Sequence, residues 1–230
     1  MEEVPSPLVF SPFMRRVALA AIVLYSLPAS AADGLLGYYR QPALHGDTVV
    51  FYAESDLWKV PVQGGIAQRL TTHLERERFP CISPDGKTVA FTASYDGTHE
   101  IYLMPLEGGR PTRLTHEGVS GQRGPRPVSW KSNRELVYAT WYFAVRDTHQ
   151  LAVLDVENGR KRLLPLEQAS DGEFADDGET LFFTRLPRQG SFAKRYRGGL
   201  IENLWRFRTG DKEAVALTAD YDGTSRAPMV

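Results

Sequence analysis

The sequence contains very little cysteine, no strong excess of either charge and no apolar run long enough to cross a bilayer. Its single cysteine, Cys81, excludes an intrachain disulfide and any metal site built from several cysteines. A net charge of −1 gives no reason to expect nucleic acid or an anionic membrane as a partner. With 42% hydrophobic and 24% charged residues, the composition is that of an ordinary globular protein.

Short motifs of common active sites are also missing. The sequence has no G-x-S-x-G, H-E-x-x-H, Walker A, EF-hand or G-x-G-x-x-G pattern. His116-Glu117 begins like a zinc-protease motif, but Ser120 stands where the second histidine would be. His73 and His116 are therefore expected in solvated loops. We predict no catalytic residue, no cofactor and no metal site in this chain, and no activity for the chain alone.

What the sequence does contain is a repeated unit, which is clearest in residues 78–115. Four β-rich runs are separated there by Ser-Pro-Asp-Gly, by Asp-Gly and by Gly-Gly. Asp-Gly favours tight hairpin turns because glycine accepts positive φ without steric cost. Four runs joined by such turns predict a four-stranded antiparallel meander.

Copies of this unit recur along the chain, and three of them end in Leu-Thr. The copies span about residues 38–72, 78–116, 126–166 and 171–219. Residues 226–230 then repeat the sequence pattern of residues 78–82, which begin the second copy. A period of roughly 40 to 50 residues with four strands predicts an all-β fold, a partial β-propeller with about four blades of a six- or seven-bladed ring. On this interpretation, residues 32–230 are an incomplete N-terminal propeller, and the chain is the front of a longer protein.

Residues that recur at one position of the repeat are expected to pack in the core. One such set is Trp58, Tyr102 and Trp205. A second set is Ala43, Cys81, Val128 and Met229, which predicts a small buried residue rather than a nucleophile at Cys81. Aspartates that precede glycine are expected to cap turns rather than to act as paired carboxylates. These are Asp85, Asp96, Asp171 and Asp177.

The N-terminal residues 1–31 are interpreted as an upstream segment followed by an export signal. Arg15-Arg16 precedes an apolar run at residues 17–27, and residues 28–31 supply small residues for cleavage. The run is too short to span a bilayer, which needs about 20 residues. Met14 is expected to be the true start, because the preceding residues include Glu2, Glu3 and three prolines. These features predict a periplasmic or secreted protein with no membrane span in its mature form.

The blade pattern resembles the repeats of TolB and of peptidase propellers. The opening blade resembles the N-terminal propeller of tricorn protease and its bacterial homologues, through residues 42–47, Asp56-Leu57-Trp58 and Leu70-Thr71. A second match is the Tyr-Arg-Gly-Gly insert at residues 196–199, which is followed by Leu204-Trp205.

The resemblance implies an exported tricorn-like serine peptidase that degrades peptides, in which this propeller filters and channels unfolded chains. Catalytic residues would then lie in later domains. The implied partners are peptides or unfolded polypeptide, a C-terminal propeller with the catalytic domains, and further copies in a homo-oligomer. Family members without a signal are cytoplasmic. Two alternatives stay open: a TolB-like protein-binding propeller of the envelope without peptidase activity, and the propeller of a prolyl-oligopeptidase-like enzyme.

Two groups of basic residues are candidates for binding. Arg123 and Arg126 lie in the connection between the second and third blades. The resemblance implies that they hold the terminal carboxylate of a peptide, a task that suits bidentate arginine. The alternative is an exposed loop. Residues 194–197 carry Lys194, Arg195 and Arg197, which would contact a neighbouring subunit or domain, or else form a solvated loop.

Overall fold

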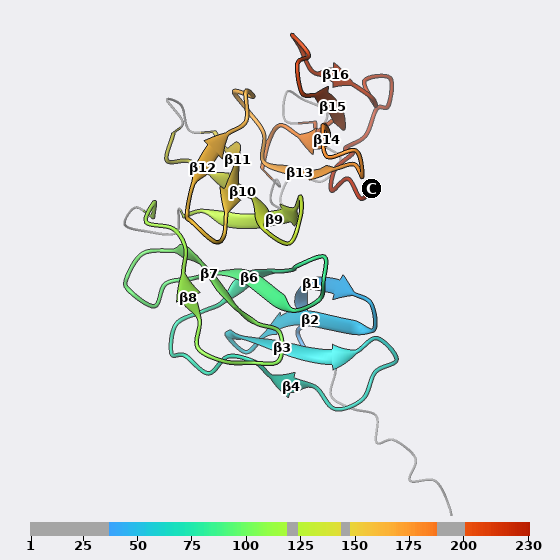
Figure 1. Ribbon diagram of the computed structural model, residues 1–230. Coiled ribbons are helices and arrows are strands. Elements are labelled where there is room, and N and C mark those ends of the chain that lie inside the picture. Colours follow the sequence, from blue (N-terminus) through green and yellow to red (C-terminus); the bar gives the residue numbers. More distant parts are fainter. Residues whose placement is uncertain (1–36, 119–123, 144–147, 188–200) are drawn as a thin grey trace, which may run out of the picture. The chain divides into compact units, whose positions relative to one another are not determined.

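The structure is a computed structural model that describes residues 37–118, 124–143, 148–187 and 201–230 (Figure 1). Every regular element in these residues is a β-strand. None of them forms a helix with the length and apolar character that crossing a membrane requires. The predicted signal at 14–31, Arg123 and the basic insert at 194–197 lie outside the described residues.

The strands form four sheets, each built from four strands that follow one another in the chain. The first sheet contains β1 (Arg40–His45), β2 (Thr48–Ala53), β3 (Asp56–Pro61) and β4 (Gln68–Arg69). The second contains β5 (Arg78–Ile82), β6 (Thr88–Ala93), β7 (Glu100–Pro105) and β8 (Thr112–Arg113). The third contains β9 (Arg126–Trp130), β10 (Glu135–Thr140), β11 (Gln150–Asp155) and β12 (Lys161–Leu163). The fourth contains β13 (Asp171–Phe174), β14 (Thr180–Thr184), β15 (Trp205–Arg208) and β16 (Val215–Ala216).

All neighbouring strands within a sheet are antiparallel, as the repeat predicts. Each sheet is therefore one blade, and the predicted all-β propeller architecture is confirmed. Within the described residues the four blades do not close into a ring. The aromatic set is also confirmed as one shared position, because its members pair with the same residue of the second strand. The pairs are Trp58 with Phe51, Tyr102 with Phe91, and Trp205 with Phe183.

The hairpin turns follow the predicted chemistry at two aspartates. Asp85 accepts the backbone N–H of Lys87 at 3.1 Å, and the next residue in the turn is a glycine with φ of +68°. Asp177 accepts two backbone N–H groups, and these bonds lower its pKa to about 2. Asp96 behaves differently, because its carboxylate accepts the Tyr102 hydroxyl at 3.0 Å and not a backbone group.

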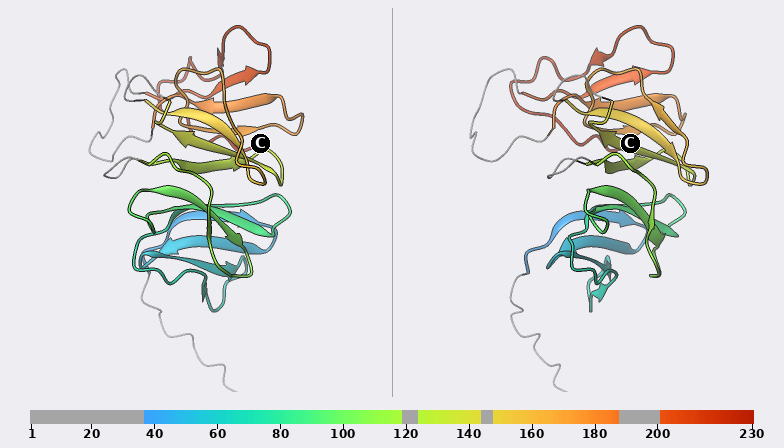
Figure 2. Two further views of the ribbon diagram at one scale, coloured as in Figure 1. Left: turned by 60° about the vertical axis from the view of Figure 1, so that its left-hand side comes forward. Right: turned by 90° about the vertical axis from the view of Figure 1, so that its left-hand side faces the viewer.

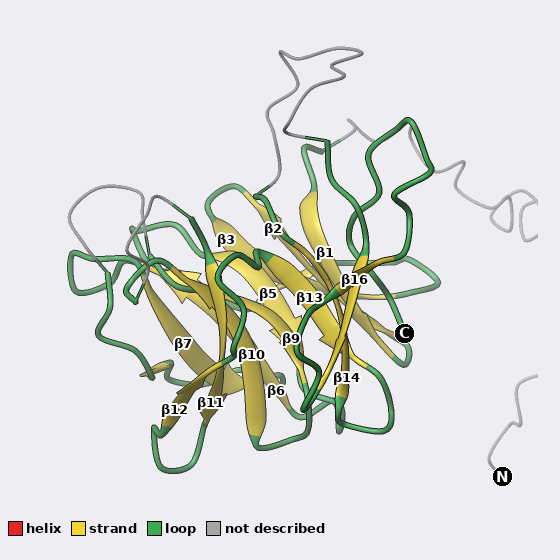
Figure 3. Ribbon diagram, turned by 90° about the horizontal axis from the view of Figure 1, so that it is seen from above, coloured by secondary structure: helices red, strands yellow, loops and turns green. Residues whose placement is uncertain are grey.

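Neighbouring blades pack face to face, with their first strands side by side along the inner edge (Figures 2 and 3). Phe91 of β6 packs with Val50 and Leu57 of the first blade. The preceding residue, Ala90, points to the opposite face of the sheet and packs on Leu136 and Tyr138 of the third blade. A strand buried on both faces depends on both neighbours, and full burial of a side chain such as Phe91 contributes about 1.5–3 kcal/mol. The third and fourth blades share a similar cluster, which includes Val137, Leu151, Leu181 and Phe183.

The threonine of the recurrent Leu-Thr pair connects the third strand of a blade to the segment after the fourth. In the first blade, the Thr71 hydroxyl accepts the Leu57 N–H at 2.9 Å. Thr115 does the same for Ile101 in the second blade, and Thr218 does so for the fourth blade. The third blade has Pro165 at this position, and no such hydroxyl is available there. The Leu-Thr signal therefore marks a hydrogen bond inside the first, second and fourth blades.

Candidate functional site

A cavity of about 520 Å³ opens where the inner strands of the second, third and fourth blades begin. We call it the inner cavity. Its lining includes three arginines, one aspartate, two histidines and several apolar residues. The lining residues from the first to the fourth blade and beyond include Gln41, Arg78, Phe79, His99, Arg126, Asp171 and Arg226.

Arg78 and Arg126 reach this cavity because they occupy the same register position in successive blades. Each is the first residue of an inner strand, and they pair with Thr92 and Ala139 respectively. Arg40 occupies the same position in the first blade. In the second and third blades, the arginine at the start of the innermost strand therefore places positive charge at the inner cavity, whereas Arg40 lies over the ring of Tyr38.

The fourth blade breaks the series, because Asp171 takes the arginine position and pairs with Thr184. The predicted turn-capping role of Asp171 is therefore wrong. Asp171-Gly172 forms the start of β13, where the chain must be extended to pair with β14. Its carboxylate faces the inner cavity instead of capping a turn.

The three arginine-led inner strands each contain a one-residue register shift, which the aspartate-led strand lacks. Such bulges bend a strand and re-aim its side chains. They also revise the expected alignment of Cys81. Cys81 pairs with Ala90, and its counterpart in the third blade is Ser129, which pairs with Val137. Val128 is the extra residue of that bulge and not the match for Cys81.

The residue after the arginine adopts a left-handed backbone in two of these strands. Gln41 has φ of +52° and Phe79 has φ of +55°, and Ala227 after Arg226 repeats this with +54°. A non-glycine residue in this region costs about 1–2 kcal/mol, and such strain tends to gather at ligand-binding places. A hydrogen bond stabilises the left-handed backbone of Phe79 in part, because the Gln41 Oε1 atom accepts the Phe79 N–H at 2.9 Å.

The arginines of the inner cavity form no ion pair with the described residues, although Asp171 and Glu202 act on Arg126 and Arg226 over a longer distance. Within the described residues, no carboxylate lies within ion-pair distance of Arg78, Arg126 or Arg226. Burial lowers the pKa of Arg126, and only the nearby Asp171 charge opposes this. Burial, followed by the charge of Arg78, also lowers the pKa of His99. A partly dehydrated cluster of unpaired guanidinium groups is suited to binding an anion such as a carboxylate.

Arg126, the one predicted binding residue that the structure describes, therefore lies in the inner cavity. Its guanidinium donates a hydrogen bond to the Ser170 carbonyl and lies 5.5 Å from the ring centre of Phe79. Its partner in the prediction, Arg123, lies outside the described residues. Arg78 and Arg226 were not predicted as binding residues, although the sequence places both at the same position of the repeat.

A larger cavity of about 740 Å³ lies between the first and second blades on the outer side, and two of its charged residues, Asp96 and Arg113, are already paired with each other. Arg113, one of its lining residues, forms ion pairs with Asp96 at 3.3 Å and with Glu100 at 3.1 Å. His73 in its wall is exposed and stacks on Tyr95, with ring centres 4.2 Å apart. His116 is exposed as well. This cavity offers less unsatisfied charge than the inner cavity.

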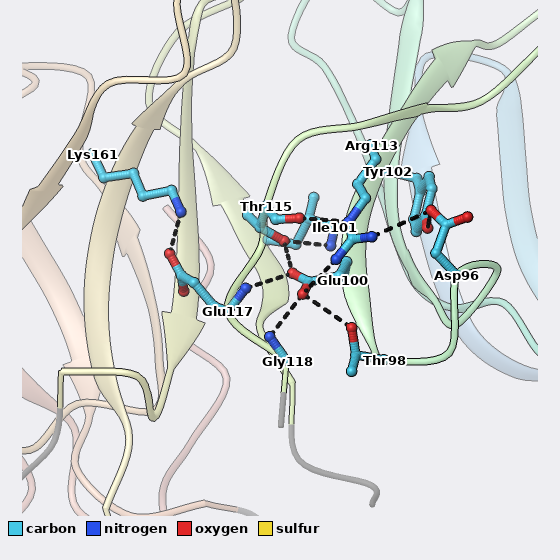
Figure 4. Close-up of polar contacts among 10 residues, drawn as sticks. All are labelled: Asp96, Thr98, Glu100, Ile101, Tyr102, Arg113, Thr115, Glu117, Gly118 and Lys161. Carbon is cyan, nitrogen blue, oxygen red and sulfur yellow. Dashed lines mark hydrogen bonds and ion pairs between the residues drawn. The ribbon is translucent and has the colours of Figure 1, made fainter. Parts of the chain in front are cut away.

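The buried carboxylate of Glu100 is a structural centre and not a reactive group (Figure 4). It accepts the Thr115 hydroxyl at 2.5 Å and the backbone N–H groups of Glu117 and Gly118 at 3.0 and 2.7 Å. Burial alone would raise the pKa of Glu100, but these donors and Arg113 together lower it. A carboxylate whose oxygens are fully engaged has no free lone pair with which to act as a base.

The described residues contain neither a metal-binding cluster nor an activated cysteine. No three or more histidine, cysteine, aspartate or glutamate side chains gather there in a way that could hold a metal ion. Burial, with the added charges of Glu173 and Asp171, raises the pKa of Cys81 to about 12. Because the thiolate is the nucleophile, such a thiol is inert near neutral pH.

Four-stranded antiparallel blades that pack face to face, with their first strands along the inner edge, define a β-propeller. A family profile described as the tricorn protease N-terminal beta propeller domain matches residues 36–230. The chain belongs to this family. It is 35% identical over 196 residues to Tricorn protease homolog 1 of Streptomyces coelicolor. That match covers 84% of this chain and 18% of the relative, so the chain spans about a fifth of the relative's length.

Solved structures show the same fold. The crystal structure of the tricorn protease superposes with a TM-score of 0.68 and 20% identity, over 85% of this chain and 20% of that one. Putative TolB from Agrobacterium tumefaciens gives a TM-score of 0.61 and 18% identity, over 79% of this chain and 62% of that chain. At these identities the likeness shows the fold and not the activity.

Proposed function

We propose that this chain is the substrate-handling propeller of a tricorn-like serine peptidase, and that its inner cavity holds the carboxylate of a peptide. The observation that carries the proposal is a group of three arginines in one cavity that form no ion pair with the described residues: Arg78, Arg126 and Arg226. Membership of the tricorn propeller family supports the peptidase context. Hydrolysis itself would be performed by residues outside this chain.

The chemistry of the cavity suits a carboxylate more than a phosphate. Asp171 and the Ser170 carbonyl add negative and dipolar character close to Arg126. This mixture of cations and acceptors suits the singly charged end of a peptide, because Asp171 can accept a hydrogen bond from a peptide N–H beside the terminal carboxylate. The apolar part of the lining, which includes Phe79, Leu186 and Pro187, can cover the aliphatic side chains of a peptide.

The test is the affinity of a fluorescein-labelled alanine pentapeptide with a free C-terminal carboxylate, measured by fluorescence anisotropy. The same peptide with an amidated C-terminus should bind at least about 10-fold more weakly, because it lacks the charge-assisted hydrogen bonds. Arg78→Gln and Arg226→Gln should each weaken binding of the free acid and leave the amide unchanged. Arg162→Gln, an exposed arginine of β12, is the matched control. Equal binding of acid and amide would refute the proposal.

We also propose export through the segment at residues 14–31, which gives a periplasmic or secreted protein. The support is the charged start, the short apolar run and the small residues that follow it. N-terminal sequencing of the protein recovered from the periplasm or medium should give Ala32 or Asp33 as the first residue. Recovery of an uncleaved chain from the cytoplasm would contradict export.

A second candidate function is a TolB-like binding module of the envelope without a peptidase. The fold likeness to TolB favours it. Sequencing the reading frame beyond codon 230 separates the two. A second propeller, a PDZ-like module and a serine-peptidase core support the first function, whereas a stop codon soon after a sixth blade supports the second. A G-x-S-x-G domain would instead indicate a prolyl-oligopeptidase-like enzyme.

A further inference from the structure

Glu77 lies in the segment that connects the first blade to the second, and none of its side chain is exposed. Its backbone N–H donates to the Ser55 carbonyl of the first blade at 3.1 Å. Its Oε1 atom accepts the hydroxyl of Tyr95, in the second blade, at 2.7 Å. Glu77 therefore connects both blades at one buried point.

The carboxyl of Glu77 has no cation to balance it when it is ionised. In the part of the chain that the structure describes, its Oε2 atom has no hydrogen-bond partner. The buried Asp56 lies near enough for its negative charge to act on Glu77, and the cation beside it, Arg69, is ion-paired with Asp56. The Thr71 hydroxyl lies near both carboxyls and donates to Asp56 at 3.4 Å.

The remaining polar side chains around this point make contacts of their own. The His73 ring lies against Tyr95, with ring centres 4.2 Å apart, and its Nδ1 atom accepts the Glu75 N–H at 3.1 Å. Glu75 is exposed and bonds Ser94. Burial raises the pKa of Glu77 to about 7, with Asp56 adding to the rise and the hydrogen bond from Tyr95 and the nearby Thr71 hydroxyl opposing it. The carboxyl therefore changes charge near neutral pH.

We propose that Glu77 is a proton-operated latch between the first and second blades, closed when its carboxyl is protonated and loosened when it is ionised. In the protonated acid the second carboxyl oxygen of Glu77 carries the proton, and the group adds no buried charge. The ionised form places a second negative charge beside Asp56 in a poorly hydrated position.

The latch acts on the inner cavity through the chain itself. Glu77 is followed directly by Arg78, whose side chain lines the cavity, and by Phe79. The Phe79 N–H is held by Gln41 of the first blade. Loosening the joint between these two blades frees the start of β5, and with it Arg78. Glu77 is thus a positioning residue for the cavity and does not touch its ligand.

The first test compares the thermal midpoint of the wild-type chain with Glu77→Gln at pH 6 and pH 8.5. Glutamine mimics the protonated acid, so the variant should lack the pH response. Because the raised pKa gives stability that is lost as pH rises through about 7, the wild type should lose about 3 to 6 °C relative to the variant over this range. Glu75→Gln, an exposed neighbour, should behave as wild type. Equal pH responses of wild type and Glu77→Gln would overturn the proposal.

The second test needs no mutation and decides the matter even if Glu77→Gln does not fold. In the wild-type chain labelled with ¹³C at the glutamate carboxyls, one carboxyl should titrate with a midpoint near pH 7. Amide exchange at Phe79, corrected for its intrinsic pH dependence, should accelerate across the same range. If every glutamate titrates below pH 6, or if corrected exchange at Phe79 is constant, the latch does not exist.

Discussion

The guanidinium of Arg126 lies 5.5 Å over the ring of Phe79 and also donates a hydrogen bond to the carbonyl of Ser170. Arg126 begins the third blade, Phe79 lies at the start of the second, and Ser170 directly precedes the fourth. One side chain therefore contacts three successive blades at the inner cavity. Arginine can do this because its planar group stacks on a ring and donates in its plane at the same time.

Arg126→Lys should weaken both the fold and the binding of a peptide carboxylate. Lysine keeps the charge but cannot stack and donate together, so we expect a loss of about 1–2 kcal/mol of stability. Affinity for the free-acid peptide should fall about 10-fold. Urea denaturation and anisotropy titration measure the two effects, with Arg162→Lys as the control. Unchanged affinity would show that Arg126 does not face the ligand.

Binding of the free-acid peptide should strengthen as the pH falls from 7.5 to 5. His99 lines the cavity, and burial followed by the Arg78 charge lowers its pKa, so it is neutral at pH 7.5 and gains its proton only below its usual range. The peptide carboxylate stays ionised throughout, because its own pKa is about 3.5. His99→Gln should reduce the gain in affinity, and the amidated peptide should show little of it. A gain of the same size in His99→Gln would contradict this role.

Thr115→Val should destabilise the second blade by about 2–3 kcal/mol. The Thr115 hydroxyl donates to Glu100 at 2.5 Å and accepts the Ile101 N–H at 2.8 Å, so valine leaves the buried Ile101 N–H without this partner and removes one of the donors to Glu100. Urea denaturation of Thr115→Val and of the exposed neighbour Thr112→Val makes the comparison. Equal stability of the two variants would show that the recurrent threonine is not a structural bond.

The purified chain should not hydrolyse peptides. Its one cysteine has a pKa raised to about 12, and the described residues hold no cluster of side chains that could bind a metal ion. Incubation with casein and with a panel of fluorogenic peptides, followed by mass spectrometry, checks this. Cleavage that co-purifies with the chain through a final size-exclusion step would show that a catalytic group has been overlooked.

The blade fold could be predicted from the sequence because its signals are local. Asp-Gly turns, short apolar runs and the Leu-Thr pair each act within a few residues, and they repeat at a regular period. The same locality explains the error at Asp171. An Asp-Gly pair looks alike in a turn and in a strand, and only the pairing of Asp171 with Thr184 distinguishes them.

The inner cavity could be predicted only in part, because its residues are far apart in the chain. Arg78 and Arg226 were visible as equal positions of the repeat, but their convergence depends on the stacking of the blades. The bulges after Arg40 and Arg78 are also hidden in the sequence, since one extra residue in a strand leaves no compositional mark. Glu77 was missed because its burial arises from two blades at once.

The most direct test of the account is a crystal structure of the chain grown with the free-acid alanine pentapeptide. We predict density for the peptide in the inner cavity, with its terminal carboxylate within hydrogen-bond distance of Arg126 and of Arg78 or Arg226. A peptide seated elsewhere, or an inner cavity closed by packed side chains, would contradict the central claim that these arginines form a carboxylate-binding site.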